Sequence, residues 1–425
     1  MAAVMKFFLV IGIISIFIQR QYVSAFERDQ VLSALPQTDR EAEVLQNLTS
    51  TFKIVLWQPA SPKNIMKNEE VHFYVNVSDV RDVKAQLNFY TIQYRVLLED
   101  VSELIQMQTV NDTVIPRTSV SYYEQYHSLK EIYRWMEHIV SKHGDLLQKI
   151  HIGTSYEKRP LYILKVSNKE DTTHKNTIWI DCGIHAREWI SPAFCLWFIG
   201  HVTHYRQRDR VMARLLQHFD FYVMPVLNVD GYEYTWTSKR MWRKSLSRNG
   251  NSSCLGTDLN RNFDAGWCGE GASEDPCDET YCGPYPESEP EVKAVVNFLR
   301  RHQNHIKAYI TMHSYSQMVL FPYSYTFNRS KDHDELLLVA NKIAHAIEVN
   351  HWNRYRAGPS AETIYLAPGG SDDWAYDLGI KYSFTFELQD KGRYGFMLPQ
   401  KFIKPTCSEA LTGIKIIASH ILNNQ

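Results

Sequence analysis

The feature that most constrains the fold is an alternation of short apolar segments with longer helical patterns, which runs from Tyr122 onward. The apolar segments have the β-branched and aromatic content of buried strands and cover residues 176–181, 219–225, 306–311 and 382–387. The helical patterns cover residues 129–141, 192–205, 289–302 and 334–349. Strands that alternate with helices predict an α/β domain with a largely parallel or mixed sheet. In such a sheet the ligand crevice lies beyond the carboxyl ends of the strands.

Composition and charge exclude two other classes of protein. The chain has 425 residues, of which 44% are apolar, so it can bury a large core and is not disordered as a whole. Its 46 basic and 47 acidic residues give a net charge of −1. A nucleic-acid partner held by a global positive field is therefore not expected.

The segment 26–117 predicts a smaller unit that mixes strands and helices ahead of the α/β domain. It is acidic, with 13 acidic and 9 basic residues. Strand content is concentrated in residues 51–57 and 71–77, and helical spacing in residues 40–48 and 80–87. The polar stretch from Asn111, which contains Pro116, predicts an exposed connector and a site of proteolytic nicking.

The N-terminal segment predicts export. Lys6, the twelve-residue apolar run Phe7–Ile18 and then Val23-Ser24-Ala25 are typical of a secretory signal that is cut after Ala25. A membrane anchor is the alternative, but a bilayer requires about 20 apolar residues. We therefore expect an extracellular product without a membrane span. Five glycosylation sequons are consistent with this: Asn47, Asn76, Asn111, Asn251 and Asn328.

Three predicted strands end in residues suited to metal or acid–base chemistry. His185 and Glu188 follow the strand 176–181, His313 follows the strand 306–311, and Glu387 ends the strand 382–387. Two histidines and one carboxylate suit Zn²⁺, and three protein ligands leave a fourth position for water. His-x-x-Glu by itself is weak, since His345 and Glu348 repeat it within a helical pattern, where a solvated helix edge is the expected role. We expect a surface or packing role for the helical pair His201 and His204.

Longer motifs add a family resemblance. Residues 182–192, Cys-Gly-Ile-His-Ala-Arg-Glu-Trp-Ile-Ser-Pro, resemble the zinc signature of the secreted metallocarboxypeptidases of the A/B type. Further family motifs follow in the family's order, namely Trp242-Arg243-Lys244, Asp258–Phe263, His313-Ser314-Tyr315, Ile364-Tyr365 and Ser383–Leu388. The resemblance covers nearly the whole chain. It implies a mixed eight-stranded sheet flanked by helices, preceded by a small ferredoxin-like α+β pro-domain.

The resemblance also implies roles for individual residues. His185, Glu188 and His313 would bind one Zn²⁺, Glu387 would be the general base, and Arg243 would stabilise the developing oxyanion. Asp258 would orient a ligating imidazole, although a helix or turn cap is the alternative role. The implied substrate-binding residues are Asn260, Arg261 and Tyr365 for the terminal carboxylate, and Arg187, Ser314 and Tyr315 along the cleft.

The resemblance places Asp372 at the floor of the pocket that selects the terminal side chain. A buried carboxylate at this position favours a cationic side chain, because leaving it unpaired is costly. We therefore expect specificity for C-terminal Lys and Arg. The alternative is that Asp372 is only a turn residue in a Gly-Gly-Ser loop.

Six of the seven cysteines lie between Cys182 and Cys282, and six cysteines allow 15 pairings. The resemblance implies the pairs Cys182–Cys195, Cys254–Cys277 and Cys268–Cys282, which leaves Cys407 free. It also implies a zymogen with a signal peptide over 1–25, an activation peptide over 26–117 and a catalytic domain over 118–425. The activating cut would fall between Arg117 and Thr118, made by a trypsin-like serine protease such as thrombin or plasmin.

These inferences predict a secreted zinc exopeptidase of plasma that trims C-terminal Lys and Arg. By resemblance, its substrates would include partly degraded fibrin, whose loss of terminal lysines slows clot dissolution, and basic-ended peptides such as kinins and anaphylatoxins. One alternative is a digestive or granule-stored carboxypeptidase B. Another is a non-catalytic binder of basic C-termini, although such proteins typically lose a metal ligand or the base, and this chain keeps all of them.

Overall fold

The computed structural model describes residues 28–109, 120–168 and 175–424, and the chain divides between Leu104 and Ile105 into two compact units. The predicted signal peptide, Asn111, Arg117 and Thr118 lie outside the described residues. No helix among the described ranges is both long enough and apolar enough to cross a bilayer.

The N-terminal unit is a four-stranded antiparallel sheet with two helices. Its elements are β1 (Gln30–Leu35), α2 (Asp39–Thr51), β2 (Ile54–Gln58), β3 (Val71–Val75), α3 (Val80–Phe89) and β4 (Gln93–Leu98). The strand order is β2-β3-β1-β4, which is the ferredoxin-like arrangement. The helix α2 begins at the N-cap Thr38, whose hydroxyl accepts from the amide of Glu41, and the Glu41 carboxylate accepts from the amide of Gln37 just before the cap.

The C-terminal unit contains the longer helices and the larger sheet. Its strands are β5 (Leu147–Thr154), β6 (Pro160–Val166), β7 (Asn176–Cys182), β8 (Phe219–Met224), β9 (Ile306–Ser314), β10 (Met318–Phe321), β11 (Arg356–Pro359) and β12 (Tyr382–Leu388). Its α-helices are α5 (Leu129–Lys142), α6 (Ile190–Tyr205), α7 (Arg210–His218), α8 (Val229–Thr237), α9 (Pro290–His302), α10 (His333–His351), α11 (Ser360–Thr363), α12 (Ser371–Asp377) and α13 (Ile403–Asn423). The helix α4 (Val101–Thr109) spans the boundary between the units.

The eight-stranded sheet is mixed, with the strand order β11-β10-β12-β9-β7-β8-β6-β5. Its four central strands, β12, β9, β7 and β8, are parallel to one another, and β10 and β6 flank them in antiparallel orientation. These central strands are the four that the sequence predicts. Their side chains are buried on both faces, which explains their near-continuous apolar sequences. The predicted α/β fold with a mixed eight-stranded sheet is confirmed.

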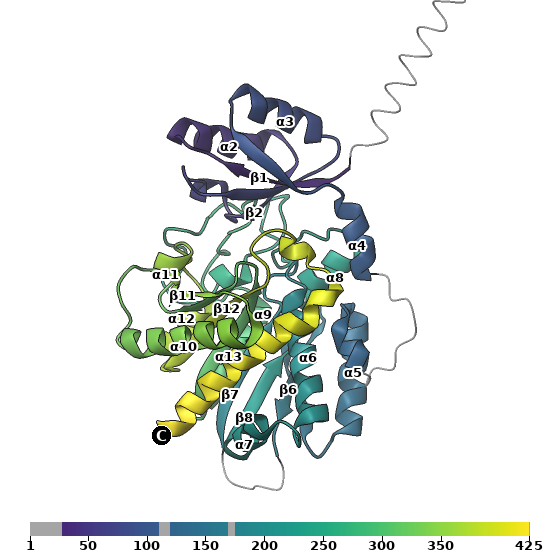
Figure 1. Ribbon diagram of the computed structural model, residues 1–425, viewed down its shortest axis with the longest axis vertical. Helices are drawn as coiled ribbons and strands as arrows, with labels where there is room; N and C mark the ends of the chain where they lie inside the picture. The colour runs from purple at the N-terminus through teal and green to yellow at the C-terminus, as the bar shows by residue number, and fades with distance from the viewer. Residues whose placement is uncertain (1–27, 110–119, 169–174, 425) are drawn as a thin grey trace, which may run out of the picture. The chain divides into compact units, whose positions relative to one another are not determined.

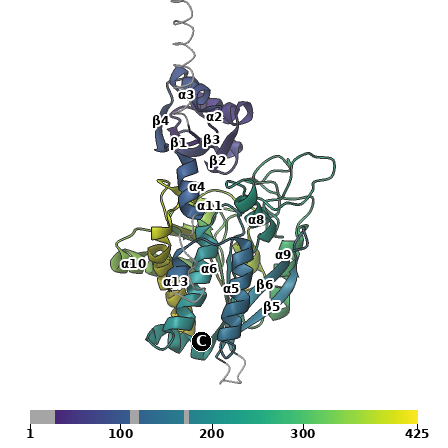
Figure 2. The ribbon, with the colours of Figure 1, turned by 90° about the vertical axis from the view of Figure 1, so that its right-hand side faces the viewer.

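Helices cover both faces of this sheet. Consecutive residues of a strand point to opposite faces. On β8, Phe221 contacts Phe198 of α6, whereas Tyr222 contacts Phe298 of α9, so α6 and α9 lie on opposite faces. On the α6 face, α6 lies between α5 and α13, the yellow C-terminal helix (Figures 1 and 2). The arrangement leaves the ends of the central strands free to carry a site.

The observed elements differ from the predicted segments mainly at their ends. The strand predicted at 51–57 begins only at Ile54, because α2 continues to Thr51. The four outer strands β5, β6, β10 and β11 and the 21-residue helix α13 are not predicted. The edge strands β5 and β11 and the strand β6 are partly exposed, β10 has only four residues, and α13 is buried on several sides, so none of them has a clean period that predicts an element.

Candidate active site

Three buried metal-binding side chains meet beyond the carboxyl ends of β7 and β9. His185 and Glu188 come from the turn between β7 and α6, and His313 comes from β9. One potential ligand atom from each lies within 4.8 Å of the other two. The Nδ1 atoms of the two histidines are 3.1 Å apart, and the Glu188 carboxylate lies 2.8 Å from His185 and 3.2 Å from His313. The structure thus brings together the three residues that the sequence predicts as metal ligands.

The turn that carries His185 and Glu188 is fixed by its own sequence. Gly183 has φ +68°, and a Cβ there would approach Pro192 to 3.0 Å, so glycine suits this position. Ser191 accepts from the Gly183 amide and donates to the carbonyl of Met312, which precedes His313. These contacts tie the turn to the neighbouring strand and set the distance between the ligands.

Disulfides brace the same region. Cys182 is bonded to Cys195, which joins the end of β7 to α6 on either side of the turn. The other pairs are Cys254–Cys277 and Cys268–Cys282, and Cys407 is free and buried. These are the pairs that the family resemblance implies.

A chain of charged contacts orients His185. Its Nε2 lies 3.1 Å from Asp258, which also accepts two hydrogen bonds from the Arg243 guanidinium at 2.8 and 3.1 Å. Burial opposes ionisation of Asp258, but Arg243 and His185 hold its pKa well below the usual range. An ionised Asp258 accepts a hydrogen bond from Nε2 of His185 and so keeps the proton on that nitrogen. The lone pair of Nδ1 is then available to bind a metal ion. Burial and Arg243 lower the pKa of His185, so the imidazole is neutral, as a metal ligand must be.

The donor set fits Zn²⁺. Two imidazole nitrogens and a carboxylate converge, and all three groups are buried. Burial opposes protonation of His313, yet the charge of Glu188 raises the pKa of His313 to about 9. The site therefore favours a positive charge between these groups, which a divalent cation would provide. Histidine nitrogen and carboxylate oxygen are ordinary zinc ligands, and three of them leave an open coordination position.

Glu387 lies beside this cluster on the next strand. In the parallel pairing of β12 with β9, Glu387 is the partner of His313. Part of the Glu387 surface is accessible, but desolvation by the surrounding protein raises the pKa of its carboxyl to about 8. His313 opposes this shift and Glu188 reinforces it. A carboxyl with a pKa near neutrality can both take and give a proton at physiological pH.

A second group of residues offers donors for an anion. The guanidinium of Arg261 is buried, and its Nη2 forms no hydrogen bond within the part of the chain that the structure describes. Asn260 accepts from the amide of Ser371, which precedes Asp372, so this group is joined to the predicted specificity loop. Tyr365 is half-buried and contributes to the electrostatic environment of Arg243.

Asp372 is buried at the start of α12. Its carboxylate accepts from the Thr385 hydroxyl at 2.8 Å, and its carbonyl accepts from Ser383 at 2.7 Å. Burial raises the pKa of this carboxyl. Within the described ranges, no Lys or Arg forms an ion pair with Asp372. A buried carboxylate without a cationic partner is expected where a ligand supplies the cation.

Arg187 and Tyr315 contact one aromatic side chain, Phe396, that the sequence does not single out. The Arg187 guanidinium lies over the ring of Phe396 at 4.4 Å, and Tyr315 contacts the same ring edge-on at 5.1 Å. The backbone amide of Ser314 donates to Glu188. Glu279, which lies 3.9 Å from Arg187, was also missed. Neither Phe396 nor Glu279 stands in a chemical motif that could have identified it.

Other predicted residues lie elsewhere. His345 and Glu348 are both exposed on α10, and Glu348 pairs with Arg354, as expected for a solvated edge. His201 pairs with Asp209, and His204 contacts Tyr123, so both have packing roles. Of the sequons, Asn47, Asn251 and Asn328 are exposed and Asn76 is half-buried.

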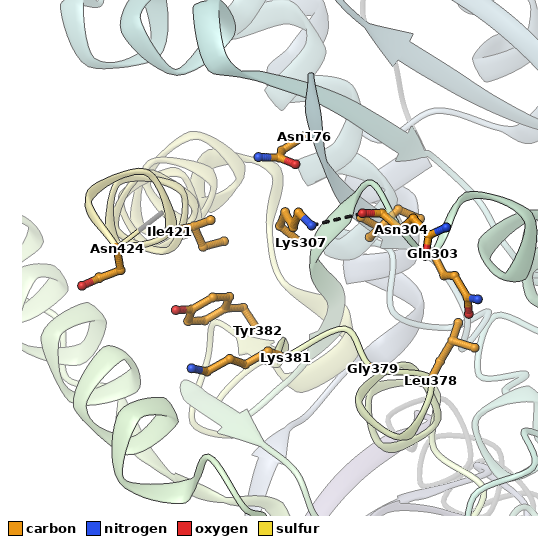
Figure 3. A pocket seen from close by; sticks show the side chains of 11 residues that line it. Asn176, Gln303, Asn304, Lys307, Leu378, Gly379, Lys381, Tyr382, Ile421 and Asn424 are labelled. Atoms are coloured by element: carbon orange, nitrogen blue, oxygen red, sulfur yellow. Dashed lines mark hydrogen bonds between the residues drawn. The ribbon is translucent and has the colours of Figure 1, made fainter. Parts of the chain in front are cut away.

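A second hollow lies at the opposite ends of the central strands. It has a volume of about 760 Å³ and includes Asn176, Ile306 and Tyr382, which begin β7, β9 and β12 (Figure 3). Lys307 lines it and donates to the carbonyl of Asn304. Among the described residues, the only cluster of potential metal ligands is His185, Glu188 and His313. The candidate active site is therefore at the carboxyl ends.

Comparisons with known proteins find family matches over most of the chain. Residues 132–413 match the family described as zinc carboxypeptidase, and residues 32–108 match the carboxypeptidase activation peptide. Human carboxypeptidase B2 is 62% identical over 406 residues, covering 95% of this chain and 96% of that protein, and the rat protein is 62% identical over 414 residues, covering 97% and 98%. A crystal structure of thrombin activatable fibrinolysis inhibitor superposes with a TM-score of 0.92 at 62% identity, covering 94% of this chain and all of that one. Mouse mast cell carboxypeptidase A is 45% identical, covering 99% of this chain and all of that protein.

Proposed function

The chain belongs to the zinc carboxypeptidase family, as the zymogen of a metallocarboxypeptidase, and from this premise we propose that the activated enzyme removes C-terminal Lys and Arg from peptides and proteins. The observation that carries the proposal is the buried carboxylate of Asp372, which no Lys or Arg of the described chain neutralises. A substrate Lys⁺ or Arg⁺ would supply the missing charge. The similarity to carboxypeptidase B2 of several mammals supports the same specificity.

We propose that Arg261, Asn260 and Tyr365 hold the terminal carboxylate of the substrate. The buried Nη2 of Arg261 has a free donor, and a guanidinium is suited to a carboxylate. Asn260 accepts a hydrogen bond from the amide of Ser371, which precedes Asp372. This bond links the residues proposed to bind the terminal carboxylate to the residue proposed to bind the terminal side chain. Arg187, Ser314 and Tyr315 would contact the part of the peptide that precedes the terminal residue.

The catalytic roles follow from the charges around the cluster. When bound by His185, Glu188 and His313, Zn²⁺ supplies Lewis-acid polarisation of the scissile carbonyl and a more acidic water. The Glu387 carboxylate takes a proton from the attacking water and gives it to the leaving amine. Burial disfavours the charged form of the Arg243 guanidinium, but the charge of Asp258 offsets this and raises the pKa of Arg243. Its positive charge would stabilise the negative charge that develops on the substrate oxygen.

We further propose activation by cleavage between Arg117 and Thr118, by a trypsin-like serine protease such as thrombin or plasmin. The boundaries would be 1–25 for the signal peptide, 26–117 for the activation peptide and 118–425 for the enzyme. The match of residues 32–108 to the activation peptide and the polar connector that follows support this division.

The proposed setting is extracellular, in plasma. A secretory signal pattern, three disulfides and exposed sequons support export. The similarity to thrombin activatable fibrinolysis inhibitor supports fibrin C-terminal lysines as substrates and hence a slowing of fibrinolysis. Kinins and anaphylatoxins are further candidate substrates because they end in basic residues. A digestive or granule-stored role is less well supported, since mast cell carboxypeptidase A is 45% identical and the carboxypeptidase B2 relatives about 62%.

The test of specificity compares two peptides that differ only in a C-terminal Arg or Phe. The activated enzyme should have the higher kcat/KM for the Arg peptide. In Asp372→Asn, kcat/KM for the Arg peptide should fall by about 100-fold or more, since the substrate charge would be left unpaired, while the value for the Phe peptide should change little. The Phe peptide is the control for folding. A wild-type preference for Phe would reject the specificity. If the activated wild type showed no chelator-sensitive hydrolysis of either peptide, the enzyme would be rejected in favour of a binder.

A further inference from the structure

The turn that joins β9 to β10 closes over the end of β12, directly beyond Glu387. In the sheet, β12 lies between β9 and β10, and Glu387 is paired with His313 on one side and with Met318 on the other. The amides of Ser316 and Gln317 both donate to the carbonyl of Leu388, at 3.1 and 3.2 Å. The position of this turn therefore bears on the position of Glu387 relative to His313.

The turn has an unfavourable backbone conformation. Ser316 has φ +154° and Gln317 has φ +57°, and neither is glycine. Such conformations are costly for residues with a Cβ and persist only where the surroundings hold them in place. The surroundings here include the buried side chain of Gln317, whose Nε2 donates to Oδ1 of Asn353 at 2.6 Å and to the carbonyl of Arg354 at 2.9 Å.

One buried carboxylate connects this turn to the end of β12. Glu409 of α13 is 2% exposed. Its Oε1 accepts from Asn353 at 3.1 Å and from Gln389 at 2.7 Å, and its Oε2 accepts from the Tyr355 hydroxyl at 2.9 Å. Gln389 is the second residue after Glu387, and Asn353 is the residue that holds Gln317. A single side chain of the C-terminal helix thus anchors both segments next to the base.

We propose that Glu409 is a positioning residue, which holds the β9–β10 turn and the end of β12 together and so fixes Glu387 against His313. The inference rests on the roles proposed above for these two residues. Removing the carboxylate would leave the buried donors of Gln389 and Tyr355 and the half-buried amide of Asn353 without this acceptor. Asn353 would then hold Gln317 and the turn less firmly. Asp372 and Arg261 are not part of this hydrogen-bonded group, so binding of the C-terminal residue of the substrate should be nearly unaffected.

The test measures kcat and KM of the activated enzyme, with rates divided by the concentration of zinc-loaded protein. Glu409→Leu should lower kcat by about 10- to 100-fold with little change in KM, because supporting residues of this kind have effects of that size. It should also shift the pH profile of kcat/KM, since the environment of Glu387 changes. Glu409→Gln should retain kcat within about threefold, because its amide oxygen can serve Asn353 and Gln389 and its amide nitrogen can donate to Tyr355.

A matched control lies one turn along the same helix. Thr412 of α13 is bonded to His351 of α10 at 2.9 Å, and this bond does not involve the turn. Thr412→Val should lower thermal stability without changing kcat per zinc. If Glu409→Leu does not fold, Gln389→Leu should still lower kcat several-fold.

Wild-type kcat in Glu409→Leu, or in Gln389→Leu where the first variant does not fold, would overturn the proposal. An equal loss of kcat in Thr412→Val would overturn it as well, because a general loss of stability would then explain the effect. Full activity of Glu387→Gln would instead reject the catalytic roles on which the inference depends.

Discussion

His313 and Glu387 are direct partners in the parallel pairing of β9 with β12, so a predicted metal ligand and the predicted base are neighbours across one strand boundary. The two residues are 74 positions apart in the sequence, and each is the polar end of an apolar strand. The pairing places the Glu387 carboxyl close enough to His313 and Glu188 for their charges to affect its pKa.

The first prediction concerns Glu387 itself. Glu387→Gln keeps the shape of the side chain but removes its ability to take a proton, so kcat should fall by about 10²- to 10⁴-fold. KM and zinc content should remain near their wild-type values, because the ligands and the carboxylate-binding group are intact. Steady-state kinetics with metal analysis checks this, and Glu348→Gln on the surface of α10 is the control. Wild-type kcat in Glu387→Gln would show that another group moves the proton.

A second prediction concerns pH and stability. Glu291 of α9 is fully buried, and burial raises the pKa of its carboxyl to about 8. One of its oxygens accepts from the amide of Tyr156, and the other has no hydrogen-bond partner within the described residues. The pKa of Glu291 is thus higher in the folded state than its value of about 4.5 in the unfolded state. The contribution of the protonated carboxyl to the free energy of unfolding is therefore fully present below about pH 4.5. This stabilisation is lost as the pH rises toward about 8.

Glu291→Gln should remove that part of the pH dependence. Urea unfolding at pH 5 and pH 8 should show that the wild type loses more stability over this interval than the variant does. Other titrating groups, including those at the metal site, are common to both proteins and cancel in the difference. Glu274→Gln, at an exposed position, should behave as the wild type. Identical slopes for Glu291→Gln and the wild type would show that Glu291 is ionised when folded.

A third prediction concerns activation. Thrombin digestion of the full chain should produce a new N-terminus at Thr118 together with activity on peptides that end in Arg or Lys. Arg117→Ala should remain uncut there and inactive. Two basic pairs elsewhere in the chain, Lys239-Arg240 and Arg300-Arg301, are poorer sites. Arg240 is buried and Arg300-Arg301 lies within α9, so Arg301→Ala serves as the control. Normal activation of Arg117→Ala would place the cut elsewhere.

Sequence alone could predict the parts of the fold with a clear period. The four central strands are fully buried runs of β-branched and aromatic residues, and α5 and α9 have distinct apolar faces, so both kinds of element were predicted within a few residues. The position of His185 and Glu188 directly after such a strand distinguished them from His345 and Glu348. The local pattern indicates these residues as candidates because the relevant chemistry lies at strand ends, and the family resemblance is what assigns them as the ligand set.

The rest of the site depends on contacts between distant segments. Phe396 lies in a short 3₁₀ helix, Gly395–Met397, and belongs to no motif, and only the fold places it against Arg187 and Tyr315. Glu409 resembles any glutamate on a helix until its bonds to Gln389 and Asn353 are seen. The hydrogen bond between Asn260 and Ser371 joins residues 111 positions apart. Pairings of this kind leave no periodic signal in a single sequence.

The most direct test of the account is the zinc content of three proteins after dialysis against metal-free buffer: the wild type, His313→Ala and His345→Ala. Two histidines and one carboxylate are proposed to bind a single ion, so the wild type and the exposed His345→Ala control should each retain one zinc per chain. His313→Ala should retain almost none and should lose peptidase activity in parallel. A full equivalent of zinc in His313→Ala, with activity preserved, would contradict the proposed metal site.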